Sequence, residues 1–362
     1  MPLDPFFEER LRVHRRYLLG KALSAVRGRI SALWPFQRES PAGSGADEPR
    51  KTGGASAPAV STPTRTRARH RRAALAWDRK ELQTVGTAGP VVRTAEHVVA
   101  VGGQPDVRVR IYYPGIEHAG AVPACLAFFG GAFRIGGIDY PTTDAAFRRR
   151  AVDAGIAIIA VDYALAPEHR YPTQVEQAHA ALVWLFQHAE ELGVDAERIG
   201  VAGMSAGGGI AAAVTLMNRD RLRLPLRLQV LEVPVTDLTG RHLDFRATRA
   251  LGIPTLIAVR ELRSVARTYL PIDADALEAY ASPLRAPSHA GLPPAVILTA
   301  EYDPLRGDGA AYGAALRRAG VEASVVQYLG VTHDIAIFTG VLDSARRWHS
   351  DVVSALRRLY ED

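Results

Sequence analysis

The chain has 362 residues, of which 48% are hydrophobic and 23% are charged. This composition excludes a globally disordered chain and a collagen-like or low-complexity protein, because most of the chain can be buried in a core. The only cysteine, Cys125, excludes an internal disulfide framework and a cysteine-rich metal site. Since the amino-terminal residues predict no secretory signal, we expect a protein of the reducing cytoplasm.

Positive charge is concentrated at the amino-terminal end. Residues 1–80 hold 17 Lys and Arg against 7 Asp and Glu, whereas the rest of the chain holds 27 against 31. The main part of the chain is therefore mildly acidic, which argues against a nucleic-acid groove there.

The basic amino-terminal part divides into two segments. Within residues 1–38, apolar residues recur at helical intervals among Arg and Lys, which predicts a basic amphipathic helix. Residues 39–72 are rich in Gly, Ser, Pro and Arg without an apolar period, so we predict a disordered linker. Two interpretations of the basic segment stay open: contact with an anionic membrane surface, or a cap helix with a solvated, disordered tail.

After a short helix predicted near 73–82, strands and helices alternate over the rest of the chain. We predict eight strands, at 92–100, 107–113, 123–129, 156–161, 198–202, 227–233, 295–300 and 323–328. Helices are predicted at 142–154, 173–192, 206–218, 307–319 and 342–359. Several strands are continuous apolar runs, which suit strands covered on both faces. Residues 73–362 are thus predicted to form an α/β domain with a mainly parallel sheet and a helical insertion at 238–285.

The most specific local motif is Gly-Met-Ser-Ala-Gly at 203–207, between a predicted strand and an alanine-rich predicted helix. A serine nucleophile at such a junction sits on a tight turn, and the flanking glycines remove β-carbons that would clash there. The start of the following helix favours the negative charge that develops in acyl transfer. An ordinary turn of small residues is the alternative, but the strand–turn–helix context favours Ser205 as a nucleophile.

A serine nucleophile needs a base, and the expected chain order is serine, acid, histidine. His333 follows the predicted strand 323–328, at the edge of the sheet where chemistry is expected. His289 instead precedes a strand and is expected in a surface loop. We therefore predict His333 as the base.

The acid is expected at the end of the strand before that of the base. Asp303 lies just past the predicted strand 295–300, and Glu301 is its nearest competitor. Asp308 and Asp334 are expected to cap helices or to be solvated. These positions predict Asp303 as the acid that orients the base.

Acyl transfer also requires backbone N–H groups that face the oxyanion. The segment Phe128–Phe133 follows the predicted strand 123–129 and contains two consecutive glycines. It could be an ordinary loop, but it also offers a turn of the kind that an oxyanion hole needs.

From about residue 90 to 360, the chain resembles the hormone-sensitive-lipase-like branch of the α/β-hydrolases, the bacterial family IV esterases. The segments that carry the resemblance are Phe129–Phe133, Val161–His169, Gly203–Gly208, Pro234–Leu238, Tyr280–Leu284, Glu301–Arg306 and His333. Together they are far more specific than any one motif alone.

The resemblance implies an α/β-hydrolase fold with an eight-stranded sheet and a helical cap, to which residues 1–82 and 238–285 would contribute. It implies a catalytic triad of Ser205 as nucleophile, His333 as general base and acid, and Asp303 as orienting group. It also implies that the backbone N–H groups of Gly131, Ala132 and Ala206 form an oxyanion hole. No metal or organic cofactor is expected.

The chain departs from the family pattern at four positions. Phe129 stands where the family usually has histidine, and Ala132 where it has a third glycine. Met204 replaces the usual Asp or Thr, and Asp334 the glycine after the base. Because Phe129 can anchor its loop only by packing, we expect a looser oxyanion hole and modest turnover on generic esters.

The predicted function is hydrolysis of small-molecule carboxylic esters, with short- to medium-chain acyl groups, through an acyl-enzyme. A catalytically impaired ligand-binding receptor or regulator on the same scaffold is the alternative, because a fold does not determine a function. An intact Ser205, Asp303 and His333 favour the enzyme. A homodimer is left open as a further hypothesis.

Overall fold

The computed structural model describes residues 1–12, 63–115 and 120–361. These residues belong to two units: Pro2–His70, and Arg71–Asp362 together with Met1. In the first unit, residues 5–12 are helical, as predicted. The rest of the predicted amphipathic helix, and residues 39–62 of the predicted linker, lie outside the described residues.

Helix α2 (Pro63–Thr84) corrects the predicted boundary of the linker. It begins at Pro63, so residues 63–72 are helical rather than disordered. Proline at the start of a helix is favourable, and the Arg and Ala residues that follow are good helix formers. The sequence prediction gave more weight to the absent apolar period than to these local preferences.

The second unit is built on an eight-stranded sheet with the order β1-β2-β4-β3-β5-β6-β7-β8. Its strands are β1 (Thr94–Val99), β2 (Val107–Tyr112), β3 (Val122–Phe128), β4 (Ala157–Asp162), β5 (Val194–Met204), β6 (Leu226–Glu232), β7 (Ala295–Tyr302) and β8 (Ala323–Thr332). Strand β2 runs antiparallel to both neighbours, and the other strands pair in parallel. All eight predicted strands and the mainly parallel sheet are confirmed.

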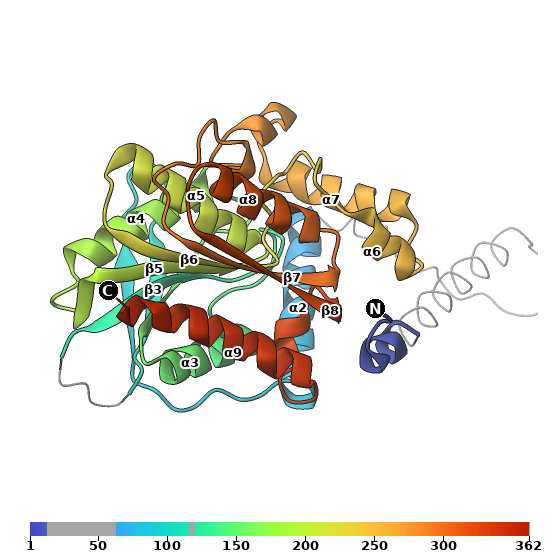
Figure 1. The fold of residues 1–362 in the computed structure, drawn as a ribbon, viewed down its shortest axis with the longest axis horizontal. Coiled ribbons are helices and arrows are strands. Elements are labelled where there is room, and N and C mark those ends of the chain that lie inside the picture. Colours follow the sequence, from blue (N-terminus) through green and yellow to red (C-terminus); the bar gives the residue numbers. More distant parts are fainter. Residues whose placement is uncertain (13–62, 116–119, 362) are drawn as a thin grey trace, which may run out of the picture. The chain divides into compact units, whose positions relative to one another are not determined.

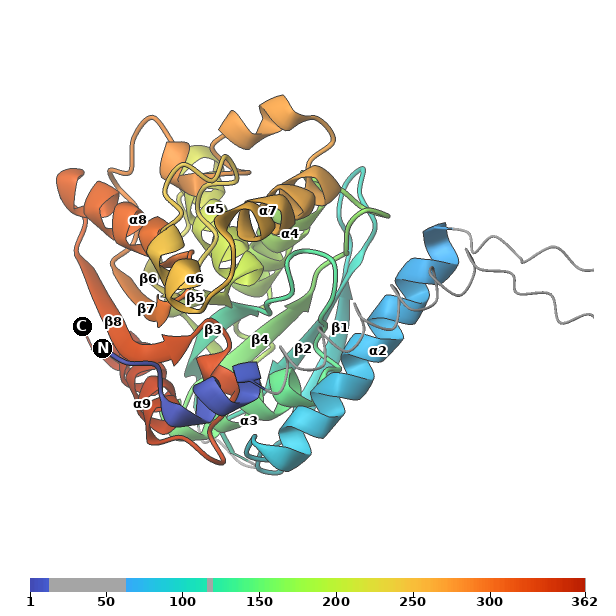
Figure 2. The ribbon, with the colours of Figure 1, turned by 90° about the vertical axis from the view of Figure 1, so that its right-hand side faces the viewer.

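Helices cover both faces of this sheet, as Figure 1 and Figure 2 show. One face carries α3 (Pro141–Ala154) and α9 (Asp343–Arg357), and the other carries α4 (Thr173–Gln187), α5 (Ala206–Arg221) and α8 (Arg306–Arg318). Every residue of β3 is buried, as expected for a continuous apolar strand between two helical layers.

The predicted insertion after β6 is helical. It contains α6 (Phe245–Ala250) and α7 (Thr255–Tyr269), followed by two short 3-10 helices, at Asp273–Leu277 and Pro283–Arg285. The chain then returns to the sheet as β7. Because β3, β5, β7 and β8 are parallel, the loops that follow them meet at one edge of the sheet.

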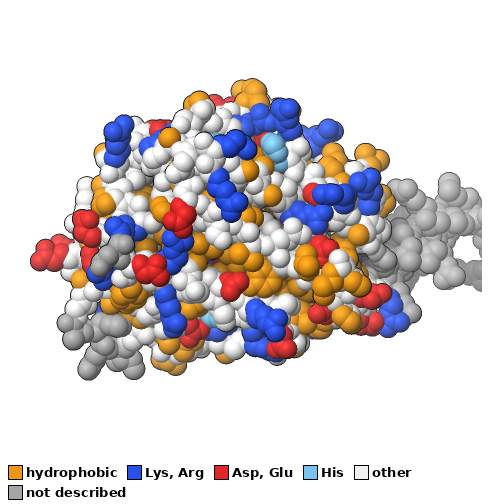
Figure 3. Space-filling model, in the orientation of Figure 1, with side chains coloured by type: hydrophobic (Ala, Val, Ile, Leu, Met, Phe, Trp, Pro, Cys, Tyr) orange, Lys and Arg blue, Asp and Glu red, His pale blue; other side chains and the backbone are white. Residues whose placement is uncertain are grey.

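The surface of the second unit has mixed charge. Figure 3 shows Lys and Arg side chains interspersed with Asp and Glu over the visible face. In the part of the chain that the structure describes, no helix is both long and apolar enough for a membrane crossing.

Candidate active site

Ser205 occupies a sharp turn between β5 and α5. Its φ is 55° and its ψ −116°, and its N–H donates to the carbonyl oxygen of Glu232 over 2.8 Å. A β-carbon on Gly203 would lie 2.1 Å from the Gly207 oxygen, and one on Gly207 would lie 2.3 Å from the Phe128 oxygen. The two glycines are therefore required by close backbone contact, as the motif predicted.

The structure brings the three predicted triad residues together in one hydrogen-bonded chain. His333 Nε2 lies 3.0 Å from Ser205 Oγ, and His333 Nδ1 lies 2.7 Å from Asp303 Oδ2. Asp303 is 1% exposed and its other oxygen accepts the N–H of Leu305. The carboxylate is thus fixed on its own loop, and it fixes the imidazole in turn.

The environment of His333 favours its protonated form. Burial by itself would lower the pKa of the imidazole, but the charge of Asp303 and the hydrogen bond to it outweigh burial. Asp334 adds a smaller attraction, and the pKa of His333 is raised to about 9. The orienting carboxylate therefore makes this histidine a stronger base than a free one.

The competing residues lie elsewhere. Glu301 accepts the N–H of Gly330 rather than contacting His333. Asp334 is exposed, as expected. The prediction of a surface position for His289 was wrong: it is 7% exposed and bonded through Nε2 to the Pro283 oxygen.

Asp308 lies in the first turn of α8 but neither caps the helix nor is solvated, contrary to prediction. It is fully buried, and its Oδ2 accepts the N–H groups of Thr236 and Asp237. Burial raises the pKa of Asp308 to about 7, and the nearby charges of Asp237 and Asp303 contribute. Its position in a helix, five residues after the loop acid Asp303, gave no sign of burial in the sequence.

The loop after β3 forms a tight turn beside the serine. The N–H of Arg134 donates to the Gly131 oxygen over 2.9 Å, and the central residues Ala132 and Phe133 have φ of 53° and 59°. Positive φ at both central positions is the property of a type I′ turn. A β-carbon on Gly130 would lie 3.4 Å from Ser205 Cβ, so this loop packs directly against the elbow.

The N–H groups predicted to form an oxyanion hole lie on this turn and at the start of α5. Among the described residues, the N–H groups of Gly131, Ala132 and Ala206 donate to no protein acceptor. They are therefore free to donate to a bound oxyanion. The aim of these groups at a substrate stays a prediction.

Phe129 anchors the loop through an aromatic partner. Its ring, 3% exposed, stacks on Tyr163, and the Tyr163 hydroxyl donates to the Phe129 oxygen. The predicted anchoring by packing is confirmed, and a polar bond to the backbone supplements it. The looser oxyanion hole expected from Phe129 stays a prediction.

Behind the elbow lies a buried polar cluster that the sequence analysis missed. The Glu232 carboxylate accepts a hydrogen bond from Arg150 over 2.8 Å and one from Trp348 Nε1 over 2.6 Å. These residues belong to β6, α3 and α9 respectively. A glutamate at the end of the apolar strand at 227–233 was the available signal, because a buried carboxylate needs partners.

A cysteine thiol can act as a nucleophile, and clustered His, Cys, Asp or Glu side chains can bind a metal ion. Cys125 is completely buried in β3, and burial raises the pKa of its thiol to about 12, so it is inert. The described ranges contain no cluster of three or more His, Cys, Asp or Glu side chains arranged to hold a metal ion.

Sequence comparison places this geometry among known hydrolases. Residues 125–337 match the family model described as the alpha/beta hydrolase fold. Carboxylesterase NlhH of Mycobacterium tuberculosis is 36% identical over 290 residues, which are 77% of this chain and 86% of that protein. Esterase LipI of the same species is 38% identical over 253 residues, which are 69% of this chain and 78% of that protein.

Solved structures agree with these relatives. The carboxylesterase EstE1 from a metagenomic library has a TM-score of 0.74 and 33% identity, covering 82% of this chain and 98% of that one. The hyperthermophilic esterase of Pyrobaculum calidifontis has a TM-score of 0.72 and 32% identity, covering 83% and 94%. The chain therefore belongs to the α/β-hydrolase fold family, in its hormone-sensitive-lipase-like, or bacterial family IV, esterase branch.

Proposed function

We propose that this carboxylic-ester hydrolase acts through Ser205, His333 and Asp303, by way of an acyl-enzyme. The observation that carries the proposal is the chain of hydrogen bonds from Ser205 Oγ through His333 to Asp303. The relatives named as esterases support ester hydrolysis, and they favour an enzyme over a receptor on the same scaffold.

In the first half of the reaction, Ser205 Oγ forms a bond to the ester carbonyl carbon. Its proton passes to His333 Nε2, while the Nδ1–H donates to Asp303. The carbonyl oxygen becomes an oxyanion that the N–H groups of Gly131, Ala132 and Ala206 stabilise. The bond to the alcohol oxygen then breaks, and that oxygen takes the proton from Nε2 and leaves.

In the second half, water replaces the alcohol. His333 Nε2 takes one proton from the water as its oxygen bonds to the acyl carbon. The bond between that carbon and Ser205 Oγ breaks, the carboxylic acid leaves, and the serine regains its proton. No group beyond these side chains and N–H groups is consumed.

The direct test compares serine variants on a chromogenic short-chain ester. Ser205→Ala is expected to remove turnover, whereas Ser350→Ala, at an exposed position on α9, is expected to keep it. Unaltered melting temperatures establish that both variants fold. If Ser205→Ala retains most of the wild-type turnover, Ser205 is not the nucleophile.

The acid is tested by two isosteric variants. Asp303→Asn is expected to lower turnover by about 10⁴-fold, since the amide leaves the imidazole in the wrong tautomer. Glu301→Gln, at the competing carboxylate, is expected to change turnover by less than about threefold, because Glu301 does not touch His333. The reverse order of effects would make Glu301 the orienting acid.

We further propose that the substrates are short- to medium-chain acyl esters and that residues 1–38 are part of the cap over the site. The apolar residues of this segment are numerous enough to cover an acyl pocket. Removal of residues 1–36 is expected to shift the acyl-length profile over a series of 4-nitrophenyl esters. An unchanged profile would separate this segment from substrate selection.

A further inference from the structure

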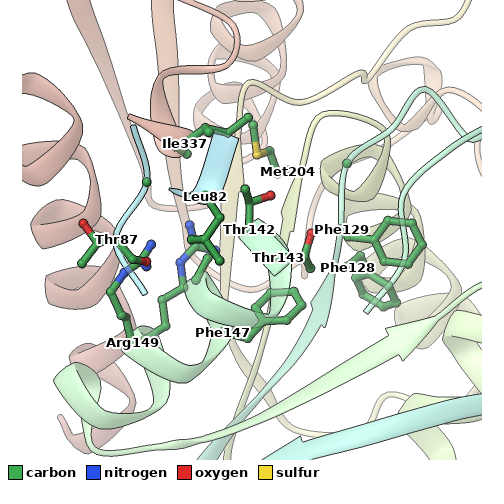
Figure 4. Close-up of a pocket in the computed structure, with 15 residues that line it drawn as sticks. Leu82, Thr87, Phe128, Phe129, Thr142, Thr143, Phe147, Arg149, Met204 and Ile337 are labelled. Atoms are coloured by element: carbon green, nitrogen blue, oxygen red, sulfur yellow. The ribbon is translucent and has the colours of Figure 1, made fainter. Parts of the chain in front are cut away.

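A cavity of about 70 Å³ lies beside the nucleophile elbow (Figure 4). Met204 and Gly130 form one part of its wall, and the apolar side chains of Leu82, Phe147 and Ile337 form another. Two guanidinium groups, those of Arg149 and Arg150, complete the lining. The cavity therefore combines an apolar body with cationic groups.

The cavity adjoins residues that flank the proposed nucleophile, because Gly130 and Met204 both line it. A β-carbon on Gly130 would lie 3.4 Å from Ser205 Cβ and 3.2 Å from the Met204 oxygen. Gly130 and Met204 thus lie in the cavity wall and beside Ser205 at the same time, so the cavity adjoins the site of the proposed reaction.

Arg150 is neutralised, because it forms a buried ion pair with Glu232 at 2.8 Å. Among the residues that the structure describes, no carboxylate forms such an ion pair with Arg149. Its Nη1 donates to the Thr87 backbone oxygen, and its Nε is completely buried without a hydrogen-bond acceptor in the described part of the chain.

The charge of Arg149 is correspondingly costly. Burial, and then the neighbouring Arg150, lower its pKa to about 10. Asp153, one turn further along α3, attracts it weakly but is itself paired with His349 at 2.7 Å. Arg149 is half-buried, and a partly buried cation without a paired carboxylate is stabilised by an anion that binds beside it.

The cavity lining offers surfaces for the chain of a substrate as well as for its anion. Figure 4 shows Arg149 and Thr87 on one side of the cavity and Phe128 and Phe129 on the other. The side chain of Leu82 lies between these two groups, and so do those of Thr142 and Thr143. A few methylene groups of a substrate can pack against Leu82, with a carboxylate beside Arg149.

We propose that the cavity binds the carboxylate of short-chain ester substrates through Arg149, so that the enzyme favours half-esters of small dicarboxylic acids or their counterparts with the carboxylate on the alcohol. The inference rests on the proposed function of Ser205. It adds a class of substrate, namely short esters that carry one negative charge.

Two ester pairs distinguish where the carboxylate is carried. Monomethyl succinate and its uncharged analogue methyl pentanoate place the difference on the acyl side. The anion 3-acetoxypropanoate and butyl acetate place it on the alcohol side. Alkyl esters are used because their spontaneous hydrolysis is slow, and the released acid is followed by titration at constant pH.

The measured quantity is the ratio of kcat/KM for the charged ester to that for its uncharged analogue. Arg149→Met is expected to lower this ratio at least about tenfold for one pair, as loss of a hydrogen bond to a charged group does. Arg149→Lys is expected to keep most of it. The control is Arg148→Met, which alters an arginine paired with Asp144 on the same helix and outside the cavity lining.

The outcomes separate the two proposals. A ratio that Arg149→Met and Arg148→Met leave equally unchanged, for both pairs, overturns the carboxylate site while ester hydrolysis stands. Persistence of hydrolysis of the uncharged esters in Ser205→Ala overturns the proposed function instead. Should Arg149→Met not fold, loss of the preference in Arg149→Gln supports the site, and retention of it contradicts the site.

Discussion

Phe129 lies face to face with Tyr163, with their ring centroids 4.1 Å apart and their planes inclined by 8°. The Tyr163 hydroxyl donates over 2.8 Å to the carbonyl oxygen of Phe129 itself. One tyrosine therefore holds both the side chain and the backbone of the residue that begins the oxyanion loop. Phe129, held in this way, occupies the place where the family pattern has a histidine.

Replacement of Phe129 by histidine is expected to weaken this arrangement. The ring is 3% exposed, and a β-carbon on Gly136 would already lie 2.8 Å from it, so the site is apolar and closely packed. An imidazole there would bury polar nitrogens at a cost of about 1–3 kcal/mol. We expect a lower melting temperature and no gain in turnover on a short ester.

Tyr163→Phe is the matched control, since it keeps the stacked ring and removes only the hydroxyl. We expect it to cost about 1 kcal/mol and to lower turnover less than Phe129→His does. A Phe129→His enzyme with higher turnover and unchanged stability would show that the loop can use a polar anchor after all.

Ala132→Gly is expected to stabilise the protein while preserving activity. Ala132 has a φ of 53°, which costs an L-residue roughly 1–2 kcal/mol, and glycine adopts it without that cost. The greater freedom of glycine in the unfolded chain offsets about 0.4–1 kcal/mol of the gain. Because the N–H remains, turnover should stay within a few-fold of wild type.

Ala310→Gly, at an exposed position of α8, is the control, and we expect it to lower the stability of the protein. There the substitution should cost about 1 kcal/mol, since the backbone is helical. Chemical denaturation of the two variants compares them directly. Equal losses of stability would show that the turn at Ala132 is not strained.

The pH dependence of kcat/KM should reflect His333. The general base must be neutral, and its pKa in the folded protein is raised to about 9. Activity on an ester whose leaving group does not titrate should therefore rise from pH 6 to pH 9, above the range near 7 expected for an ordinary histidine. A plateau reached already at pH 6 would contradict this assignment.

The stability that His333 contributes should fall as the pH rises, whereas activity should increase. A raised pKa means that the folded state holds the proton more tightly than the unfolded chain does, so this contribution is full below about pH 6.5. It is lost as the pH rises through about 9. The melting temperature of wild type relative to His333→Gln should accordingly be highest in acid and fall towards alkaline pH.

The stability of Asp308→Asn relative to wild type should increase as the pH rises. The folded pKa of Asp308, about 7, exceeds its ordinary value of 3.8, so the stability that its protonated form contributes is full below about pH 3.8 and is lost as the pH rises through about 7. Asparagine keeps an oxygen for the N–H groups of Thr236 and Asp237 and carries no charge. Thermal melting at pH 5 and pH 8.5 compares the variant with wild type.

The gain of Asp308→Asn should be small at pH 5 and larger at pH 8.5. Ser350→Ala, at an exposed position on α9, removes no ionisable group and is the control, which should show no such trend. A pH-independent difference for Asp308→Asn would mean that its carboxyl group does not titrate in this range.

Local patterns predicted the sheet and the triad because they depend on neighbours in the sequence. The run at 156–161 is apolar at every position, and Ser205 lies between glycines that only a strand–helix junction requires. Asp303 and His333 follow from chain order and from strand ends. Apart from that chain order, each of these features can be recognised from a few neighbouring residues.

The missed features depend on residues that are distant in the sequence. Arg150 and Glu232 are 82 positions apart, and each alone resembles a solvated charge. His289 and Asp308 are buried by elements that come together only when the sheet forms. For helix α2, local propensity prevailed over the missing apolar period.

Because Ser205 has a positive φ, the residue that the proposed reaction requires is not the one that would make the folded protein most stable. A serine at φ 55° gives up folding free energy that a glycine would not. Ser205→Gly should therefore yield an inactive protein that resists heat better than the active one, whereas Ser205→Ala keeps the same unfavourable backbone. Selection for thermal resistance alone would thus tend to remove the nucleophile, and screens for hardier variants need an activity readout at every round.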